Sequence, residues 1–148
     1  EVESIRQEME QKERKAMELA NQTADIIFPG EQQPESDHGI RYEQAETGTN
    51  KDRHFRRAKG WFGYTLKTSK EASRLMITTR KNDPMKVVIL LNNEKLTAAP
   101  TISETDQEGF VILCYPLPQK LGAGNYPIRF SPDGTEWTPA IYEIRLLE

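Results

Sequence analysis

The alternation of apolar and polar side chains from residue 61 onward restricts the fold more than any other feature of the sequence. Apolar residues recur at every second position in segments 62–66 and 75–79: Phe62, Tyr64 and Leu66, and then Leu75, Ile77 and Thr79. A period of two places the members of each set on one face of a strand. The C-terminal two thirds of the chain therefore predict β-structure with one buried face per strand.

Further apolar segments extend this pattern to the C-terminus. KVVILL (86–91) is β-branched and mostly apolar, which predicts a central strand buried on both sides. Asn92-Asn93 tolerates left-handed turn geometry, so this strand and EKLTA form a predicted hairpin. Further strands are predicted at FVILCYP (110–116), which should end at Pro116, at YPIRF (126–130) and at AIYEIRLL (140–147). About seven strands without intervening helices predict an antiparallel β-sandwich of the jelly-roll type.

The first 60 residues are predicted to be less regular. Residues 1–20 contain no Gly or Pro and are rich in good helix formers, which predicts one N-terminal helix. We therefore divide the chain into a connector helix (1–22) and a β-sandwich domain (23–148). No heptad is sustained, so a helix leaning on a neighbouring domain is favoured over a coiled coil. TADIIF (23–28) predicts a short strand, and PGEQQPESDHG predicts an irregular exposed loop. Residues 45–60 lack periodicity and contain TGTN, which predicts a turn.

The sequence offers no catalytic or cofactor motif. The single cysteine, Cys114, lies in an apolar strand and excludes both an intrachain disulfide and a cysteine-based zinc site. Glu35, Asp37 and His38 could together ligate a metal, but a loop in which Asp37 caps a turn is the simpler interpretation. We therefore expect no enzyme activity, no cofactor and no metal.

The stretch HFRRAKGWFGYTLK (54–67) has three possible interpretations: a nucleic-acid groove, a sugar platform, or the entry into a core strand. Residues 51–60 carry five basic side chains and one acidic one, yet the chain as a whole has a net charge of −3, which disfavours nucleic acid. Sugars bind aromatic rings flanked by polar side chains, and Trp61, Trp137, Arg57 and Tyr42 are of this kind. No apolar run approaches the roughly 18 residues that span a membrane.

Several motifs in this order resemble the C-terminal β-sandwich of bacterial glycoside hydrolases of the β-L-arabinofuranosidase type (glycoside hydrolase family 127). The motifs are FPGEQQPESDHG (28–39), TGTN (47–50), RRAKGWFGYTL (56–66), VVILLNNEKL (87–96), YPLP (115–118) and IYEIRLL (141–147). The matching residues are Pro29, Gly30, Gln32, Gln33, Pro34, Asp37 and His38, and then Thr47, Gly48, Arg57, Ala58, Gly60, Phe62, Tyr64 and Leu66. Two departures are Lys59-Gly60 in place of a Gly-Gly pair, and RKNDPM (80–85) in place of an aromatic-Gly pair and a longer loop.

The resemblance implies a galactose-binding-like accessory domain that packs against the catalytic domain of a parent enzyme outside the cytoplasm. The family's catalytic zinc site lies in another domain, and Cys114 matches none of its ligands. The alternative is a carbohydrate-binding module that contacts plant-type glycans through exposed aromatics. Its candidate site comprises Trp61, Arg57, His38, Asp37 and Trp137. A structural module should present an apolar patch without a cleft, whereas a binding module should present Trp61 or Trp137 beside polar groups in a concave site.

Overall fold

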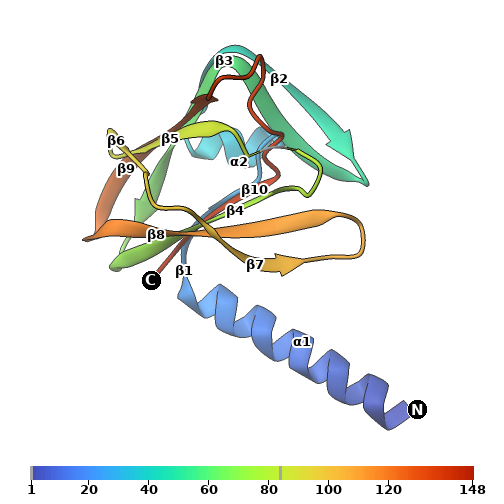
Figure 1. Cartoon of the computed structure of the whole chain (residues 1–148). Coiled ribbons are helices and arrows are strands. Elements are labelled where there is room, and N and C mark those ends of the chain that lie inside the picture. Colours follow the sequence, from blue (N-terminus) through green and yellow to red (C-terminus); the bar gives the residue numbers. More distant parts are fainter. Residues whose placement is uncertain (1, 84) are drawn as a thin grey trace.

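Two antiparallel sheets pack face to face to form the body of the molecule, and one long helix extends from it (Figure 1). The computed structural model describes residues 2–83 and 85–148. The predicted mainly β sandwich with one N-terminal helix is confirmed. Residue 1 of the predicted connector helix and residue 84 of the segment 80–85 lie outside the described residues.

Each sheet has five strands, so the described part of the chain holds ten strands rather than about seven. The first sheet has the order β1 (Thr23–Ile27), β10 (Glu143–Leu147), β4 (Ala72–Arg80), β8 (Phe110–Leu121), β7 (Thr101–Thr105). The second sheet has the order β2 (Arg41–Asn50), β3 (Arg53–Thr68), β9 (Gly124–Pro132), β5 (Val87–Leu91), β6 (Glu94–Lys95). Neighbouring strands pair antiparallel throughout both sheets.

The core lies between the sheets and consists of the side chains that the period-two pattern predicts. Phe62 and Leu66 of β3 are fully buried, as are Leu75 and Ile77 of β4. Phe62 stacks on Phe130 of β9 with ring centroids 5.0 Å apart. Burial of such side chains supplies the main favourable free energy of folding.

The β5–β6 hairpin is confirmed, but β5 is buried on one face only. Asn92 and Asn93 form the two-residue turn with φ of 54° and 66°. Ile89 and Leu91 are buried in the core, whereas Leu90 is half-buried on the outer face. The prediction of burial on both sides is wrong because no second layer covers the outer face of this antiparallel sheet.

The segment between β1 and β3 is more ordered than predicted. The expected loop contains a short helix, α2 (Gln32–Asp37), with Glu35 buried inside it. The expected turn at TGTN is part of β2, and the chain reverses at Lys51-Asp52 instead. The period of two was hidden here because a charged residue, Arg56, occupies an inward-facing position of β3.

Strand β8 continues through Pro116, where the sequence had predicted its end. β7 pairs with β8 only over Val111–Cys114, so β8 has an open edge at Pro116. A missing N–H costs no ladder hydrogen bond at such an edge.

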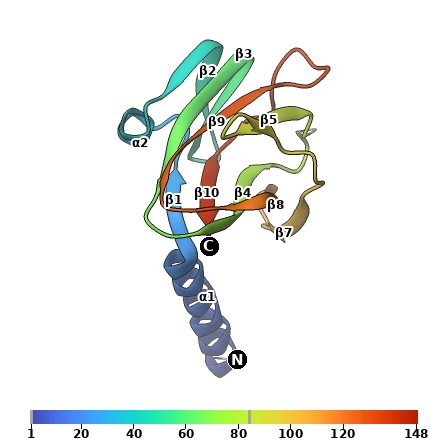
Figure 2. The same cartoon turned by 90° about the vertical axis from the view of Figure 1, so that its left-hand side faces the viewer.

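Helix α1 (Val2–Gln22) extends away from both sheets in two perpendicular views (Figure 1 and Figure 2). Its hydrogen bonds to the body are at its C-terminal end, where Asn21 accepts from Lys70 and Gln22 accepts from Arg74. Ile5, Met9 and Met17 are more than half exposed. Among residues 2–83 and 85–148, no helix is both long enough and apolar enough to cross a membrane.

Candidate functional site

The outer face of the second sheet carries a row of residues that crosses all five strands. In the strand register, Arg41 of β2 lies opposite Gly63 of β3, Gly63 opposite Arg129 of β9, and Arg129 opposite Leu90 of β5. Leu90 in turn lies opposite Lys95 of β6. Residues directly opposite each other in a ladder point to the same face, so this row places Arg41 and Arg129 on either side of Gly63 and Lys95 at its far end.

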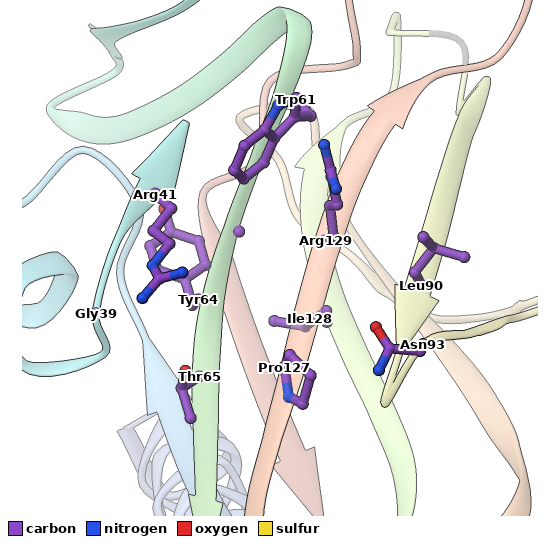
Figure 3. Close-up of a pocket in the computed structure, with 11 residues that line it drawn as sticks. Gly39, Arg41, Trp61, Tyr64, Thr65, Leu90, Asn93, Pro127, Ile128 and Arg129 are labelled. Carbon is purple, nitrogen blue, oxygen red and sulfur yellow. The ribbon is translucent and has the colours of Figure 1, made fainter. Parts of the chain in front are cut away.

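A hollow of about 330 Å³ lies on this face over β3 and β9 (Figure 3). We call it the Trp61 hollow; it is lined by Gly39, Arg41, Trp61, Gly63, Tyr64, Thr65, Leu90, Asn93, Pro127, Ile128 and Arg129. Trp61 and Thr65 flank Gly63 along the same strand, and Arg41 and Arg129 flank it across the sheet. The hollow thus combines one aromatic wall with both hydrogen-bonding and apolar side chains on its other sides.

Gly63 forms the floor of the Trp61 hollow because it has no side chain. A Cβ at this position would lie 2.5 Å from the carbonyl oxygen of Ile128, so the close approach of β9 requires glycine. Arg41 and Arg129 stand two strands apart, which is roughly 10 Å between their Cα atoms. The glycine therefore leaves space between two guanidinium groups.

Trp61 and Arg129 form one wall of the hollow together. The guanidinium carbon of Arg129 lies 3.8 Å from the centroid of the indole ring. Trp61 is half-buried, whereas Arg129 is exposed. The cation–π contact holds the guanidinium against the ring while its N–H groups stay accessible to a ligand.

Arg41 and Arg129 lack an acidic partner within the part of the chain that the structure describes. Neither guanidinium forms an ion pair or a side-chain hydrogen bond there. The residues that line the hollow include no carboxylate. Two solvent-accessible guanidinium groups with ten N–H donors are consequently available to a bound molecule.

A buried ion pair fixes the other side of β3. Arg56 donates through Nε and Nη2 to the two carboxylate oxygens of Glu35, at 2.6 and 2.9 Å, and the Tyr64 hydroxyl donates to the same carboxylate at 2.6 Å. Burial alone would raise the pKa of Glu35, but hydrogen bonds from Arg56 and Tyr64 outweigh it and leave the pKa below its usual value. Tyr64 has a raised pKa because it is buried beside this carboxylate. This cluster attaches α2 to the strand that carries Trp61.

His38 and Asp37 lie at the end of α2, outside the Trp61 hollow. His38 places Nε2 2.8 Å from Asp25 Oδ1 and Nδ1 2.7 Å from the carbonyl oxygen of Pro34. The hydrogen bond to Asp25 is the main cause of a raised pKa for His38. Asp37 is exposed and accepts a hydrogen bond from Gln33. His38 thus links the end of α2 to β1, whereas the side-chain hydrogen bond of Asp37 stays within α2.

Arg57 and Trp137 contact each other at a distance from the hollow. The Arg57 guanidinium lies 4.3 Å from the Trp137 ring centroid, and Lys59 Nζ lies 5.3 Å from it. Arg57 also pairs with Glu46. Of the five residues proposed from the sequence, Trp61 alone lines the Trp61 hollow.

A second hollow of about 340 Å³ lies where the β2–β3 turn meets the segments after β4 and before β10. It is lined by Asn50, Phe55, Arg57, Arg80, Asn82, Asp83, Thr138, Ala140 and Tyr142. Both of its arginines are engaged, Arg57 by Glu46 and Arg80 by the carbonyl oxygen of Glu108. This hollow has fewer free donors than the Trp61 hollow and includes an acidic residue, Asp83.

The three residues considered as metal ligands point to different partners. Glu35 binds Arg56 and Tyr64, Asp37 binds Gln33, and His38 binds Asp25. Across residues 2–83 and 85–148, the structure groups no three His, Cys, Asp or Glu side chains in a geometry that could hold a metal ion.

The sequence did not indicate Arg41, Thr65, Asn93 or Arg129 as residues of a binding site. Arg129 and Thr65 occupy outward positions of strands whose inward positions are apolar, so alternation assigned them to the surface. Only the register of β2, β3, β9 and β5 brings them together.

The sequence model of a domain family of unknown function, DUF6805, matches residues 18–147. The chain belongs to this family. No curated protein matches its sequence.

Solved structures of similar fold come from carbohydrate-active proteins. A family 35 carbohydrate-binding module from Clostridium thermocellum superposes with a TM-score of 0.56 at 13% identity, over 83% of this chain and 98% of that one. A family 6 module from Clostridium cellulolyticum in complex with xylose gives a TM-score of 0.56 at 10% identity, over 84% and 98%. The catalytic unit of a GH87 α-1,3-glucanase from Streptomyces thermodiastaticus gives 0.52 at 12% identity, over 85% of this chain and 26% of that one. At these identities the similarity establishes the fold of the domain.

Proposed function

We propose that this chain is a non-catalytic carbohydrate-binding module and that the Trp61 hollow is its binding site. The observation that carries the proposal is the hollow itself, in which the stacked Trp61 and Arg129 side chains border a glycine floor that has Arg41 on its other side. A saccharide presents apolar C–H faces and a rim of hydroxyl groups, so it needs an aromatic surface beside oriented hydrogen-bonding groups. The fold shared with carbohydrate-binding modules, one of them in complex with xylose, supports the same reading.

This proposal takes the alternative of the two functions considered from the sequence. A purely structural module was expected to present an apolar patch without a cleft, whereas the outer face of the second sheet presents a hollow lined by both apolar and polar residues, Trp61 among them. The binding reading places the site over Arg41 and Arg129, and assigns Arg57, Trp137, Asp37 and His38 to support of the surrounding structure.

We further propose that the module is an accessory region of a larger glycoside hydrolase, of the β-L-arabinofuranosidase type suggested by its motifs. The exposed apolar residues Ile5, Met9 and Met17 on α1 favour contact with a neighbouring catalytic domain. The glucanase catalytic unit supports this arrangement, since a domain of similar fold occupies about a quarter of that longer chain. A glycan ligand and a hydrolase partner place the protein outside the cytoplasm in this proposal.

The two tryptophans allow the binding site to be located by fluorescence. We would titrate the protein with arabinan-type and galactan-type oligosaccharides in two variants, each with one remaining indole: Trp137→Phe retains Trp61, and Trp61→Phe retains Trp137. We expect a saturable emission change in Trp137→Phe and no saturable change in Trp61→Phe. Retention of the full response in Trp61→Phe would place the ligand near Trp137 and overturn the site assignment.

Calorimetry on Trp61→Ala measures how much the Trp61 side chain contributes to the free energy of saccharide binding. An aromatic–ligand stacking contact is worth on the order of 1–3 kcal/mol, so the affinity should fall about 5-fold or more. Trp137→Ala is the matched control and should leave the affinity within about twofold. Absence of binding by the wild-type chain to every saccharide tested, neutral or anionic, would favour the structural function instead.

A further inference from the structure

The charge of the Trp61 hollow deepens the proposed function, on which this inference rests. The chain carries a net charge of −3, yet the hollow is lined by two arginines and by no acidic residue. The row that contains them ends at Lys95 on β6, which is also exposed. The lining of the hollow is therefore positively charged although the chain as a whole is acidic.

Arg41 and Arg129 differ from the arginines that the fold pairs with glutamates. Arg56, Arg57 and Arg145 all form ion pairs with glutamates. Arg41 and Arg129 form none, although Glu43 lies only one row away on β2, opposite Trp61. Exposed like-charged groups on one face repel each other, and a bound anion removes that repulsion.

The geometry suits a carboxylate or sulfate carried on a sugar ring. A guanidinium presents two parallel N–H groups that match the two oxygens of a carboxylate, and such charge-assisted pairs are about twice as strong as neutral ones. The two arginines stand on opposite sides of the Gly63 floor, roughly 10 Å apart at Cα, so a ring in the hollow lies within reach of both. Arg129 is in addition held against Trp61, which orients its N–H groups before a ligand arrives.

We propose that the Trp61 hollow selects anionic glycans, with Arg41 and Arg129 binding the acidic group of the sugar while Trp61 contacts the ring. The shared chemistry is an oxyanion on a saccharide, supplied either by a hexuronate carboxylate or by a sulfate ester. A neutral glycan would use the same arginines only as donors to hydroxyl groups, and would gain no charge-assisted bond.

The test is calorimetric titration of the full chain with three matched pairs of oligosaccharides. The pairs are tetragalacturonate and its carboxyl-reduced neutral counterpart, a glucuronate-substituted xylotetraose and unsubstituted xylotetraose, and a sulfated galactan tetrasaccharide and its unsulfated counterpart. At least one anionic probe should bind about 10-fold or more tightly than its neutral counterpart. That preference should shrink between about 50 mM and 500 mM salt, because solvent-exposed charges are screened. Which of the three anionic probes binds decides between a carboxylate and a sulfate ligand.

Three variants assign the effect to the hollow. Arg41→Gln and Arg129→Gln should each remove most of the preference for the anionic probe, while Arg14→Gln on α1 makes the same charge change away from the hollow and should not. Arg41→Lys retains the charge without the paired donors and should restore only part of the preference. Arg41 forms no ion pair within the described residues, so Arg41→Gln is expected to fold normally.

The outcomes separate this inference from the proposed function. Equal affinity for the anionic and neutral probes, with loss of both in Trp61→Ala, would overturn the anionic preference and leave carbohydrate binding standing. An anionic preference that survives both Arg→Gln substitutions would overturn the assignment to the Trp61 hollow. Failure of these probes and of the neutral arabinan and galactan panel would overturn both proposals.

Discussion

Arginines that lie on the inner and the outer side of strand β3 differ in burial and in their partners. On the inner side, Arg56 is buried, and the carboxylate of Glu35 pairs with its charge through two hydrogen bonds. On the outer side, Arg41 and Arg129 flank the same strand, exposed and without an acidic partner among the described residues. The residue type is the same, but only the outer arginines have donors left for another molecule.

The difference shows that burial and an acidic partner, rather than residue type, distinguish an arginine that stabilises the fold from one that is available to bind a ligand. A buried charge that loses its partner destabilises the fold strongly. An exposed charge without a partner contributes little to stability, so its substitution can change binding with the fold intact.

The largest effect is expected for the inner arginine. Arg56→Ala leaves the Glu35 carboxylate buried without its main partner and should lower the free energy of unfolding by about 3–5 kcal/mol. Arg41→Ala is the matched control and should change it by no more than about 0.5 kcal/mol. Urea unfolding of both variants measures the difference, and similar losses in the two would contradict the contrast.

Removal of one hydroxyl group from the same buried cluster should have a smaller effect. Tyr64→Phe deletes a donor to Glu35, and the partly unsatisfied carboxylate should cost about 1–3 kcal/mol of stability. Tyr126→Phe removes an exposed hydroxyl that donates to the Gly122 carbonyl oxygen and serves as the control. If the two variants unfold at the same urea concentration, the Tyr64 hydroxyl does not stabilise the buried ion pair.

The outer arginines can be given the kind of partner that Arg56 has. Thr65→Glu places a carboxylate in the Trp61 hollow, where it should neutralise the arginines and weaken anionic saccharide binding about 10-fold. Thr65→Gln is similar in size but uncharged, and should bind close to the wild-type level. Unchanged calorimetric affinity in Thr65→Glu would mean that the hollow is not where the anion binds.

The smallest effect concerns His38, which links α2 to β1 through Asp25. The pKa of His38 is raised in the folded chain, so its stabilisation is complete below the unfolded pKa of about 6.5 and is lost as pH rises through the folded pKa. Asp25 is the group that raises this pKa most, while nearby Lys67 opposes it. The stability difference between wild type and His38→Gln should therefore be larger at pH 5.5 than at pH 8.5. A difference that grows with pH would reverse the assigned role of Asp25.

The core of the fold follows from the sequence, because it depends on local alternation. Phe62, Tyr64 and Leu66 are all inside, as their spacing predicted. The prediction from alternation was wrong where a charged residue in a buried ion pair takes the place of an apolar one. Arg56 has the sequence pattern of a surface residue because its partner, Glu35, lies far from it in the sequence. The helix α2 was missed for the same reason, because its buried side chain is a glutamate.

The candidate site was predictable only in part. Trp61 was selected because an aromatic residue at an outward position of a strand has no role in the core. Arg41 and Arg129 are far apart in the sequence, and only the strand register places them on either side of Gly63. The alternation of residues along one strand does not determine which strand it pairs with or in which register. The hollow therefore follows only from the three-dimensional pairing of the strands.

The most direct test of the central claim is to map saccharide binding on the amide resonances of the ¹⁵N-labelled chain. The oligosaccharide would be the tightest-binding probe of the calorimetric panel, or the neutral arabinan or galactan probe if that one binds best. The account predicts shift changes centred on residues 61, 63, 65 and 129, with the first sheet and α1 unaffected. Changes centred on Asn50, Arg80 and Asn82 of the second hollow, or on α1, would contradict it.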